Sequence, residues 1–456
     1  MKKNTFAVAF LSLLLAASLL YDIKLAIGML LMIAGVILIL RSETAFIYVY
    51  FIAYLVLSSF ANRMSFSLSG NQSINLLGIL NISMILFFYF KMRDFLQMKS
   101  IHWNKNIIYP VILFSLYLLL TAPFTINLAA SIRGLTRILS GFSFYLLTYF
   151  VVVKDKNVEK KIFKFITAIF IFLLTYGIVE YVTGFNIFHN RFISNIVYLD
   201  AYDHEAIQIY NRIRTTFYHP SVYSFALLIF LPLYLYFYVK KKENKYFYGI
   251  IVILFLINIF LTFTRITWIA VFSQMLFFLY LFRPKKIMRF VFPLGVIFIL
   301  MSGQIIARAT TVDSSALGRL KLFQFGLDIF KEHPVFGSGL GTYLELAGIA
   351  AHGDYMQMFA ETGVFGGFGF LIVLLTMIIF AVKNFKECDF AKVSFLMIIG
   401  FMVFGLTDNG LSYSHVFWGL LGICNGIIVR NKLEKHQLEL EYNAVVWDRS
   451  TRIAVL

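Results

Sequence analysis

The sequence of 456 residues is poor in charge and in cysteine. Only 14% of its residues are charged, whereas 60% are hydrophobic. Soluble globular proteins carry about a quarter charged residues, so this composition excludes an ordinary soluble domain. Its hydrophobicity also excludes a disordered chain. The two cysteines, Cys388 and Cys424, are too few for a disulfide framework.

Motifs for metal or nucleotide binding are also absent. The 8 histidines form no HxxxH or HExxH pair, no P-loop occurs, and no DxD pair lies in the segments assigned below to the outer side. These absences disfavour a zinc enzyme and a soluble-type sugar-nucleotide transferase, so we expect neither metal nor cofactor. The net charge of +17 would suggest nucleic acid in a soluble domain, but in a membrane protein it first reflects topology.

Long apolar runs dominate the sequence instead. A membrane-crossing helix needs about 20 mostly apolar residues, and roughly fourteen such runs occur. They lie at 5–21, 25–40, 44–60, 74–90, 107–122, 135–153, 160–181, 221–239, 247–264, 266–282, 287–304, 362–383, 390–408 and 411–429. Several are short or closely joined, so we expect an all-α polytopic integral membrane protein with about 12–14 transmembrane helices. The start of the chain is typical of a signal peptide, but because many spans follow, we interpret it as an uncleaved first helix.

The cationic residues predict the orientation of these spans. With the N-terminus inside, every second loop is rich in lysine, as the positive-inside rule requires. Both termini then lie in the cytoplasm, and we expect a multi-pass protein of the cytoplasmic (inner) membrane. Inner segments hold 21 Lys and 7 Arg, whereas outer segments hold 3 Lys and 9 Arg. Topology does not favour arginine outside, and arginine binds phosphate or carboxylate in a bidentate manner. We therefore hypothesise that the outer face binds an anionic, phosphate-bearing ligand.

Two outer segments, 184–218 and 305–361, are long for a compact membrane protein, which favours a functional role. In the second, apolar spacing predicts an amphipathic helix over 316–331, with a stripe of Leu317, Leu320, Phe323, Leu327 and Phe330. A turn-rich loop over 333–343 follows. We divide the chain into N-terminal helices with the first long outer loop (1–210), a core with the loop 305–361 (211–383), a C-terminal hairpin (384–436) and a cytoplasmic tail (437–456).

Arginines near the outer helix ends are the first candidate site residues. Arg265 lies between two apolar runs, where a guanidinium faces a cavity or partner, or else snorkels as an interfacial anchor. Arg319 lies in the predicted amphipathic helix, and on position alone its solvated face is the simpler interpretation. Arg212 and Arg214 precede a span together with His219, which makes this stretch either a ligand-binding entry or a polar loop end.

His352 is the candidate base, just before the span at 362–383. An imidazole near pH 7 can accept a proton from a sugar hydroxyl. Asp354 and Glu361 are alternative bases or can orient the imidazole. A polar capping cluster at the start of a helix is the competing interpretation.

Other polar residues at the outer ends have simpler explanations. Asp408 and Asn409 are typical of an ordinary turn. Glu180 can pair with an arginine. Arg133 and Arg137 share one helix face, where they either line a cavity or act as anchors.

Four stretches, in order along about residues 211–370, resemble the O-antigen ligase and O-antigen polymerase superfamily of bacterial envelopes. They are an R-x-x-F-x-H-P entry (Arg214, Phe217, His219, Pro220), a [ST]-R-x-x-W step (Thr264, Arg265, Trp268), an arginine helix with a P-x-x-G-x-G run (Arg319, Pro334, Gly337, Gly339, Gly341) and a His-to-Gly segment (His352, Gly363, Gly366). The ligase form has Asn, Ser or Gln after the histidine, and Gly353 departs from that pattern.

The resemblance implies a C-type membrane glycosyltransferase that works on the outer side, with inversion and without metal or nucleotide sugar. Its donor would be an undecaprenyl-diphosphate-linked oligosaccharide, and its acceptor a glycan or a lipid-linked sugar. Its other partners would be the lipid bilayer, a chain-length regulator and a flippase, but no nucleic acid. Arg265 and Arg319, with Arg214 in support, would hold the diphosphate, and His352 would activate the acceptor hydroxyl. The further substrate-binding candidates are Arg212, His219, Asp354 and Glu361.

Several activities fit this pattern. Gly353 and the absence of an added periplasmic domain favour a polymerase of surface polysaccharide repeats (capsule, O-antigen or teichuronic-type) over a ligase that joins the glycan to lipid A-core. A flippase or other transporter of lipid-linked glycans is the alternative from another class. It predicts charges through the membrane midplane and pseudo-symmetric halves, whereas the candidates here gather at one face.

Overall fold

The computed structural model describes residues 42–59, 65–67, 73–97, 104–189, 191–192, 196–199, 206–210, 212–282 and 314–453. Eleven of the predicted apolar runs fall in this part of the chain, and each overlaps a helix. The predicted runs 5–21, 25–40 and 287–304 lie outside the described residues.

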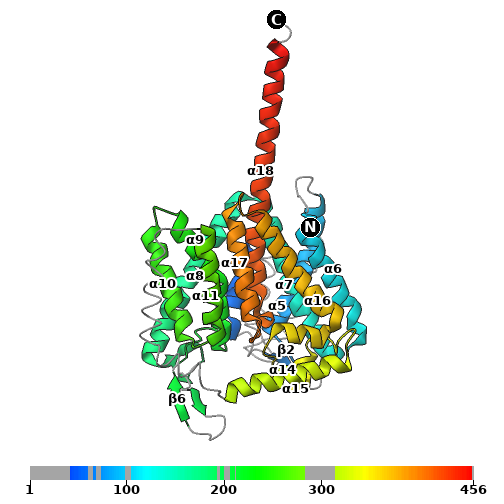
Figure 1. Cartoon of the computed structure of the whole chain (residues 1–456), viewed down its shortest axis with the longest axis vertical. Coiled ribbons are helices and arrows are strands. Elements are labelled where there is room, and N and C mark those ends of the chain that lie inside the picture. Colours follow the sequence, from blue (N-terminus) through cyan, green and yellow to red (C-terminus); the bar gives the residue numbers. More distant parts are fainter. Residues whose placement is uncertain are drawn as a thin grey trace, which may run out of the picture.

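Helices form nearly all of the described chain (Figure 1). They are α3 (Glu43–Leu55), α5 (Leu76–Gln97), α6 (Lys105–Thr121), α7 (Leu128–Lys154), α8 (Lys156–Thr183), α9 (Pro220–Lys240), α10 (Lys245–Leu261), α11 (Arg265–Phe282), α14 (Ser314–Glu332), α15 (Thr342–Ala347), α16 (Asp354–Lys383), α17 (Asp389–Phe404) and α18 (His415–Ile453). Three antiparallel two-stranded ladders join them, β1–β2 (Ser65–Ser67, Ser73–Asn75), β3–β4 (Phe185–Asn186, Arg191–Phe192) and β5–β6 (Ile196–Leu199, Ala206–Tyr210). Three-residue 3₁₀ turns are η1 (Ala122–Phe124), η2 (Ile187–His189) and η3 (Leu411–Tyr413).

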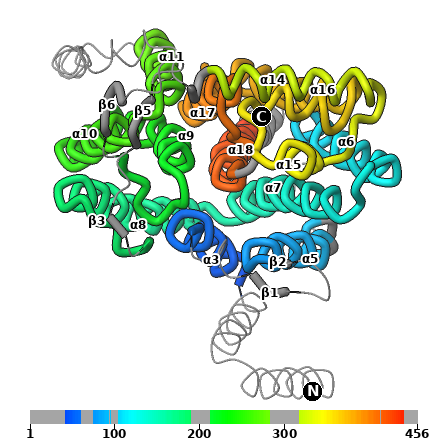
Figure 2. The backbone as a smooth tube through the Cα atoms, turned by 90° about the horizontal axis from the view of Figure 1, so that it is seen from below, coloured from blue at the N-terminus to red at the C-terminus, as the bar shows by residue number. Residues whose placement is uncertain are grey.

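The bundle confirms the predicted all-α, multi-pass membrane architecture. Six described segments are long and apolar enough to cross a bilayer: Lys105–Phe124, Leu128–Lys154, Lys156–Thr183, Pro220–Lys240, Arg265–Phe282 and Asp354–Lys383. The shorter α3 and α10, and the apolar part of α5, accompany them. The predicted amphipathic helix is also present, as α14, and it lies across one end of the bundle (Figures 1 and 2).

The core of the bundle lies around α7, α9 and α18. In α9, 89% of the most apolar window is buried inside the protein, against 33% in the peripheral α6. The interface of α7 with α18 depends on small residues, as is common between membrane helices. A side chain on Gly422 would begin 2.3 Å from the backbone oxygen of Tyr145, and the Thr148 hydroxyl donates a hydrogen bond to the Gly419 carbonyl at 3.0 Å. Close backbone approach thus fixes these two helices against each other.

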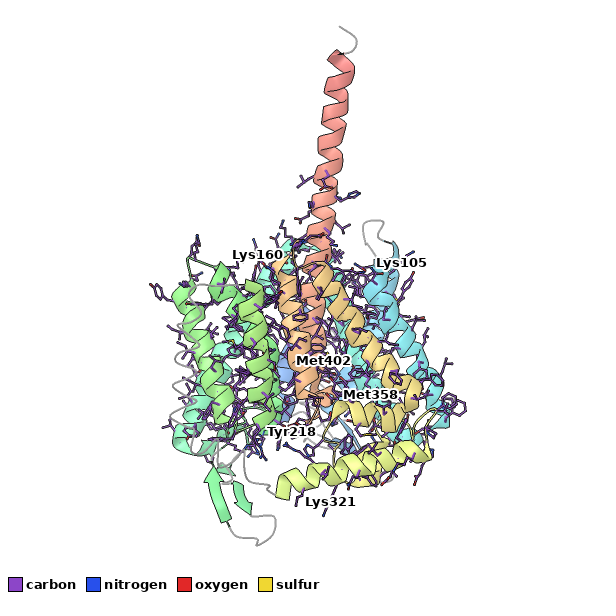
Figure 3. All side chains as sticks on the ribbon, in the orientation of Figure 1. Lys105, Lys160, Tyr218, Lys321, Met358 and Met402 are labelled. Carbon is purple, nitrogen blue, oxygen red and sulfur yellow. The ribbon has the colours of Figure 1, made fainter. Side chains whose placement is uncertain are left out.

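The two ends of the bundle can be identified in Figure 3, which labels Lys105 and Lys160 at one end and Tyr218 and Lys321 at the other. One end, here called the lysine end, contains Lys105 and Lys160. Several of its cations pair with carboxylates, including Lys240 Nζ with Asp389 Oδ2 at 2.7 Å and Arg430 Nη2 with Glu159 Oε2 at 2.6 Å. The opposite end, here called the arginine end, carries α14 and the start of α9, and the candidate residues gather there.

The last helix extends beyond the bundle. The segment predicted as a cytoplasmic tail (437–456) continues α18 as a helix to Ile453. This part of α18 projects away from the bundle at the lysine end (Figure 1).

Candidate active site at the arginine end

A buried carboxylate holds the segment with Arg212 and Arg214 in place. Glu180, near the end of α8, accepts hydrogen bonds from the backbone N–H of Thr215 at 2.7 Å and from the Asn186 amide at 2.6 Å. The Asn186 amide also donates to the Thr215 carbonyl at 2.9 Å. These bonds stabilise the left-handed conformation of Thr215, whose φ is 51°. Glu180 therefore shapes the backbone that presents Arg214, a side chain only 8% exposed.

A second turn brings Arg212 to the residues around Arg265. The Arg212 Nε–H donates to the Thr262 carbonyl at 2.7 Å, and its Nη2 donates to the Thr264 hydroxyl at 3.2 Å. Thr262 and Thr264 belong to the tight connection between α10 and α11, and Arg265 is the first residue of α11. Arg265 is partly buried. The entry segment and the S/T-R-x-x-W step, far apart in the sequence, thus share one corner of the arginine end.

The glycine-rich loop docks onto a break in α16. Gly363 has φ 69° and ψ −170°, which interrupts the helix. The loop replaces the lost helical bonds, because Ser338 N–H donates to the Ala360 carbonyl at 3.0 Å and Val364 N–H donates to the Pro334 carbonyl at 2.8 Å. A side chain on Gly337 would begin 2.3 Å from the backbone of Glu361. The backbone of the loop packs directly on the backbone of α16, so the glycines of this motif allow the two backbones to approach closely.

This docking places Arg319 on the inner face of α14. Gly326 of α14 packs against Tyr343 and Met356, Ile329 is 5% exposed, and the Tyr343 hydroxyl bonds the Leu322 carbonyl. Arg319 shares that face and is partly buried. The predicted apolar stripe is rotated relative to the packed face, since Leu320 is 55% and Phe323 45% exposed. Arg319 therefore lies on the packed face of α14 and not on its most exposed face.

The segment before α16 places His352 against the last outer loop. Both carboxylate oxygens of Asp354 accept backbone hydrogen bonds from that loop, from Gly410 at 3.1 Å and Leu411 at 3.0 Å. Asp354 N–H donates to the Gly405 carbonyl at 2.8 Å. Gly353 has φ 135°, and a side chain there would approach the Leu406 carbonyl to 3.3 Å. This geometry gives a physical reason for the glycine that departs from the ligase pattern.

Charged groups from three other segments lie within electrostatic range of His352, namely Arg319, Asp408 and His219. The charges of Asp408 and Arg319 influence the pKa of the His352 imidazole. The His352 imidazole influences the pKa of His219, and so do the charges of Arg212, Arg214 and Asp408. His352 Nδ1 and Arg319 Nε are buried, and neither has a hydrogen-bond partner among the described residues. Asp408 is 7% exposed and is the residue that sequence reasoning missed, because a D-N-G turn predicts only a turn.

Both histidines are shifted toward the neutral form. Desolvation and the Arg319 guanidinium lower the pKa of His352 below its ordinary value, and Asp408 partly opposes this. Desolvation and the Arg212 guanidinium also lower the pKa of the His219 imidazole, to about 4, although His219 is exposed as a residue. A neutral imidazole with a free ring nitrogen beside guanidinium groups can accept a proton while the guanidinium groups bind an anion.

Glu361 of α16 and Arg137 of α7 also belong to the arginine end and interact through their charges. Glu361 is 1% exposed and accepts the Tyr343 backbone N–H at 3.1 Å. The charge of Arg137, on α7, acts on both Glu361 and Asp354. Its position one turn from Arg133 predicted a cavity lining or an anchor, and the structure places it within electrostatic range of the two carboxylates. Arg133 instead pairs with Glu345 at 2.6 Å, and both side chains are largely exposed.

Comparison with known proteins agrees with the motifs. Residues 250–371 match the family model described as O-antigen ligase. This match confirms the resemblance to the O-antigen ligase and polymerase superfamily. It contains Arg265, Arg319, the glycine-rich loop and His352, whereas Arg212, Arg214 and His219 precede it and Asp408 follows it. No curated protein matches the chain. Among the described residues, no three His, Cys, Asp or Glu side chains group as metal ligands.

Proposed function

We propose that this protein transfers a glycan from an undecaprenyl-diphosphate donor to an acceptor sugar hydroxyl at the outer face of the cytoplasmic membrane. The observation that carries the proposal is the buried Nδ1 of His352, which has no described partner and lies within electrostatic range of Asp408 and of Arg319, whose buried Nε also has no described partner. An O-antigen ligase match over residues 250–371, which include Arg265, Arg319 and His352, supports it.

In this mechanism the arginines bind charge and His352 moves the proton. The acceptor oxygen attacks the anomeric carbon from the face opposite the diphosphate, which inverts the configuration. His352 takes the hydroxyl proton as the new carbon–oxygen bond forms. The bond from the anomeric carbon to the diphosphate oxygen breaks, and the lipid diphosphate leaves as an anion. Arg319 and Arg265, with Arg212 and Arg214, stabilise that developing charge.

The two buried carboxylates act as positioning residues in this proposal. Asp354 holds the loop that carries Asp408, and Glu361 holds the loop that follows α14, through the backbone bonds described above. Asp408 lies near both histidines and opposes the lowering of their pKa, so it stabilises the imidazolium that forms during transfer.

We propose surface polysaccharide polymerisation as the form of this reaction. Gly353 supports a polymerase because its positive φ leaves no strain-free place for the Asn, Ser or Gln of the ligase pattern. In that form a chain-length regulator and a flippase are the expected partners.

The decisive test uses purified protein in detergent with undecaprenyl-diphosphate oligosaccharide. We expect the glycan to lengthen when the same lipid-linked repeat is the only acceptor. Transfer to lipid A-core alone would instead establish a ligase. If no glycan is transferred but the lipid crosses the bilayer of proteoliposomes, the protein is a transporter and the enzymatic proposal fails.

A further inference from the structure

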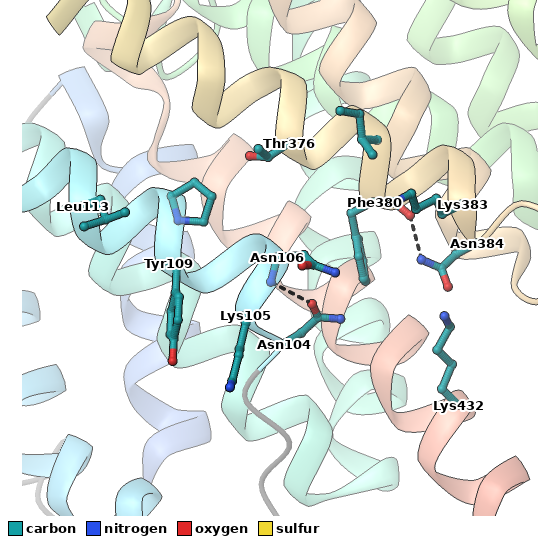
Figure 4. Close-up of a pocket in the computed structure, with 12 residues that line it drawn as sticks. Asn104, Lys105, Asn106, Tyr109, Leu113, Thr376, Phe380, Lys383, Asn384 and Lys432 are labelled. Atoms are coloured by element: carbon teal, nitrogen blue, oxygen red, sulfur yellow. Dashed lines mark hydrogen bonds between the residues drawn. The ribbon is translucent and has the colours of Figure 1, made fainter. Parts of the chain in front are cut away.

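A second polar site lies at the lysine end, on the opposite side of the bundle from the candidate active site. A cavity of about 420 Å³ opens between the start of α6 and the end of α16, next to α18 (Figure 4). Lys105, Lys383 and Lys432 line it, one from each of these helices. None of the residues assigned to glycan transfer contributes to it.

The lysines of this cavity are less neutralised than the four lysines at the same end that pair with Glu43 and Asp389. Elsewhere at this end, Glu43 pairs with Lys91 and Lys154, and Asp389 pairs with Lys240 and Lys392. Among the described residues, Lys105 and Lys383 have no carboxylate within ion-pair distance. Lys432 forms an ion pair with Glu387, in which Nζ and Oε2 are 3.3 Å apart. The cavity therefore holds a surplus of positive charge.

The walls below the lysines are apolar and open to the side of the bundle. Leu113 of α6 is 65% exposed and Ile379 of α16 is 43% exposed, and Pro110 and Phe380 lie between them and the polar rim. At the polar rim, Asn384 is 1% exposed and donates to the Phe380 carbonyl at 2.6 Å, while its Oδ1 has no partner in the described part of the chain. Cations above an exposed apolar wall match an amphiphile with an anionic head.

We propose that this cavity binds an anionic phospholipid, with its phosphate among Lys105, Lys383 and Lys432 and its acyl chains along Leu113 and Ile379. Basic pockets between membrane helices at the surface of an anionic leaflet bind such headgroups. A soluble phosphate would gain nothing from the apolar wall. The bound lipid would clasp α6, α16 and α18 together at the end of α16 remote from His352.

Native mass spectrometry of the full chain in detergent tests the proposal. The test variant is Lys105→Gln with Lys383→Gln, and the matched control is Lys160→Gln with Lys161→Gln. The control lysines are exposed at the same end, also lack a described carboxylate partner, and lie outside the cavity. Phosphatidylglycerol should bind the parent and the control equally. It should bind the test variant about 25-fold more weakly, at roughly fivefold per lysine.

Further arms identify the ligand and guard against misfolding. Thr376→Trp fills the cavity without removing a lysine and should also abolish binding of the lipid. Phosphatidylcholine, glycerol phosphate and inorganic phosphate should bind all of these proteins weakly. Equal phosphatidylglycerol binding by parent, test and control would overturn the proposal. Strong phosphatidylcholine binding would overturn the need for an anion, and tight binding of glycerol phosphate would overturn the role of the acyl chains.

Discussion

The docking of the glycine-rich loop on the break in α16 leads to our most specific prediction, for Gly363→Ala. The conformation at Gly363, with φ 69° and ψ −170°, is essentially restricted to glycine and costs other residues about 1–3 kcal/mol. The new Cβ would also begin 2.2 Å from the Val335 carbonyl oxygen, which is backbone and cannot rotate away. The loop must therefore move off the helix.

The energy of that movement follows from the bonds that it breaks. Three backbone hydrogen bonds join the loop to α16, at N···O distances of 2.8, 3.0 and 2.9 Å for the donors Val364, Ser338 and Gly339. At about 1 kcal/mol each, their loss with the backbone strain amounts to roughly 4–6 kcal/mol. Since the loop connects α14 to α16, Arg319 would lose its position relative to His352. We expect glycan transfer to fall about 10²–10³-fold, the usual cost of one lost transition-state donor.

Two measurements separate this effect from global unfolding. Hydrogen exchange of residues 333–343 should accelerate strongly in Gly363→Ala, while exchange in α7 and α9 stays slow. The matched control is Gly318→Ala on α14, where a Cβ meets no atom within 4 Å. It should keep full activity and stabilise the helix by about 1 kcal/mol. A Gly363→Ala protein with parental activity and parental exchange in the loop would refute the reasoning.

Three further predictions concern the site residues. Arg265→Lys should lose most transfer activity despite its charge, because lysine lacks the planar fork that binds diphosphate; near-normal kcat/KM would reduce Arg265 to an anchor. His352→Ala should abolish transfer while binding of the lipid-linked donor persists, and surviving activity would move the base to Asp354 or Glu361. The pH profile should depend on Arg319, whose charge helps to lower the pKa of His352. A base with a lowered pKa stays neutral until the pH falls below its ordinary value, so Arg319→Gln should raise that pKa and move the acidic limb of log kcat/KM to higher pH. If the acidic limb did not move, the charge of Arg319 would not control the pKa of the catalytic base.

The apolar runs predicted the helices well because length alone identifies a membrane span. A continuous apolar stretch of this length has no other stable arrangement in a bilayer. For helix α14, the same reasoning predicted the position of the helix but not the face that packs on the bundle. Leu320 and Phe323 are exposed, while Gly326 and Ile329 are buried. In a membrane protein, lipid-facing and protein-facing surfaces are both apolar, so hydropathy alone cannot choose between them.

Some site residues were likewise predictable from the sequence, and others were not. Arginines at helix ends and a histidine before a span were visible in the sequence because an ionisable residue near a bilayer demands a partner. The sequence places Asp408 in an ordinary turn and leaves Arg137 as either a cavity residue or an anchor, because their environment depends on contacts between distant segments. Asp408 lies in a D-N-G turn, and only the folding of the last loop onto Asp354 brings its charge to His352.

The same contacts explain why the glycine motif and the charged residues occur in a fixed order. Arg319 lies on α14 and His352 lies in the segment just before α16, and the glycine-rich loop and α15 connect the two. A flexible loop would leave their separation variable, which would weaken any site that needs both groups at one phosphate. Gly337 and Gly363 remove that freedom by allowing backbone to contact backbone at the break in α16. The glycines thus position the arginine and the base together, and a site built this way depends as much on the absence of side chains at these positions as on the presence of the charged ones.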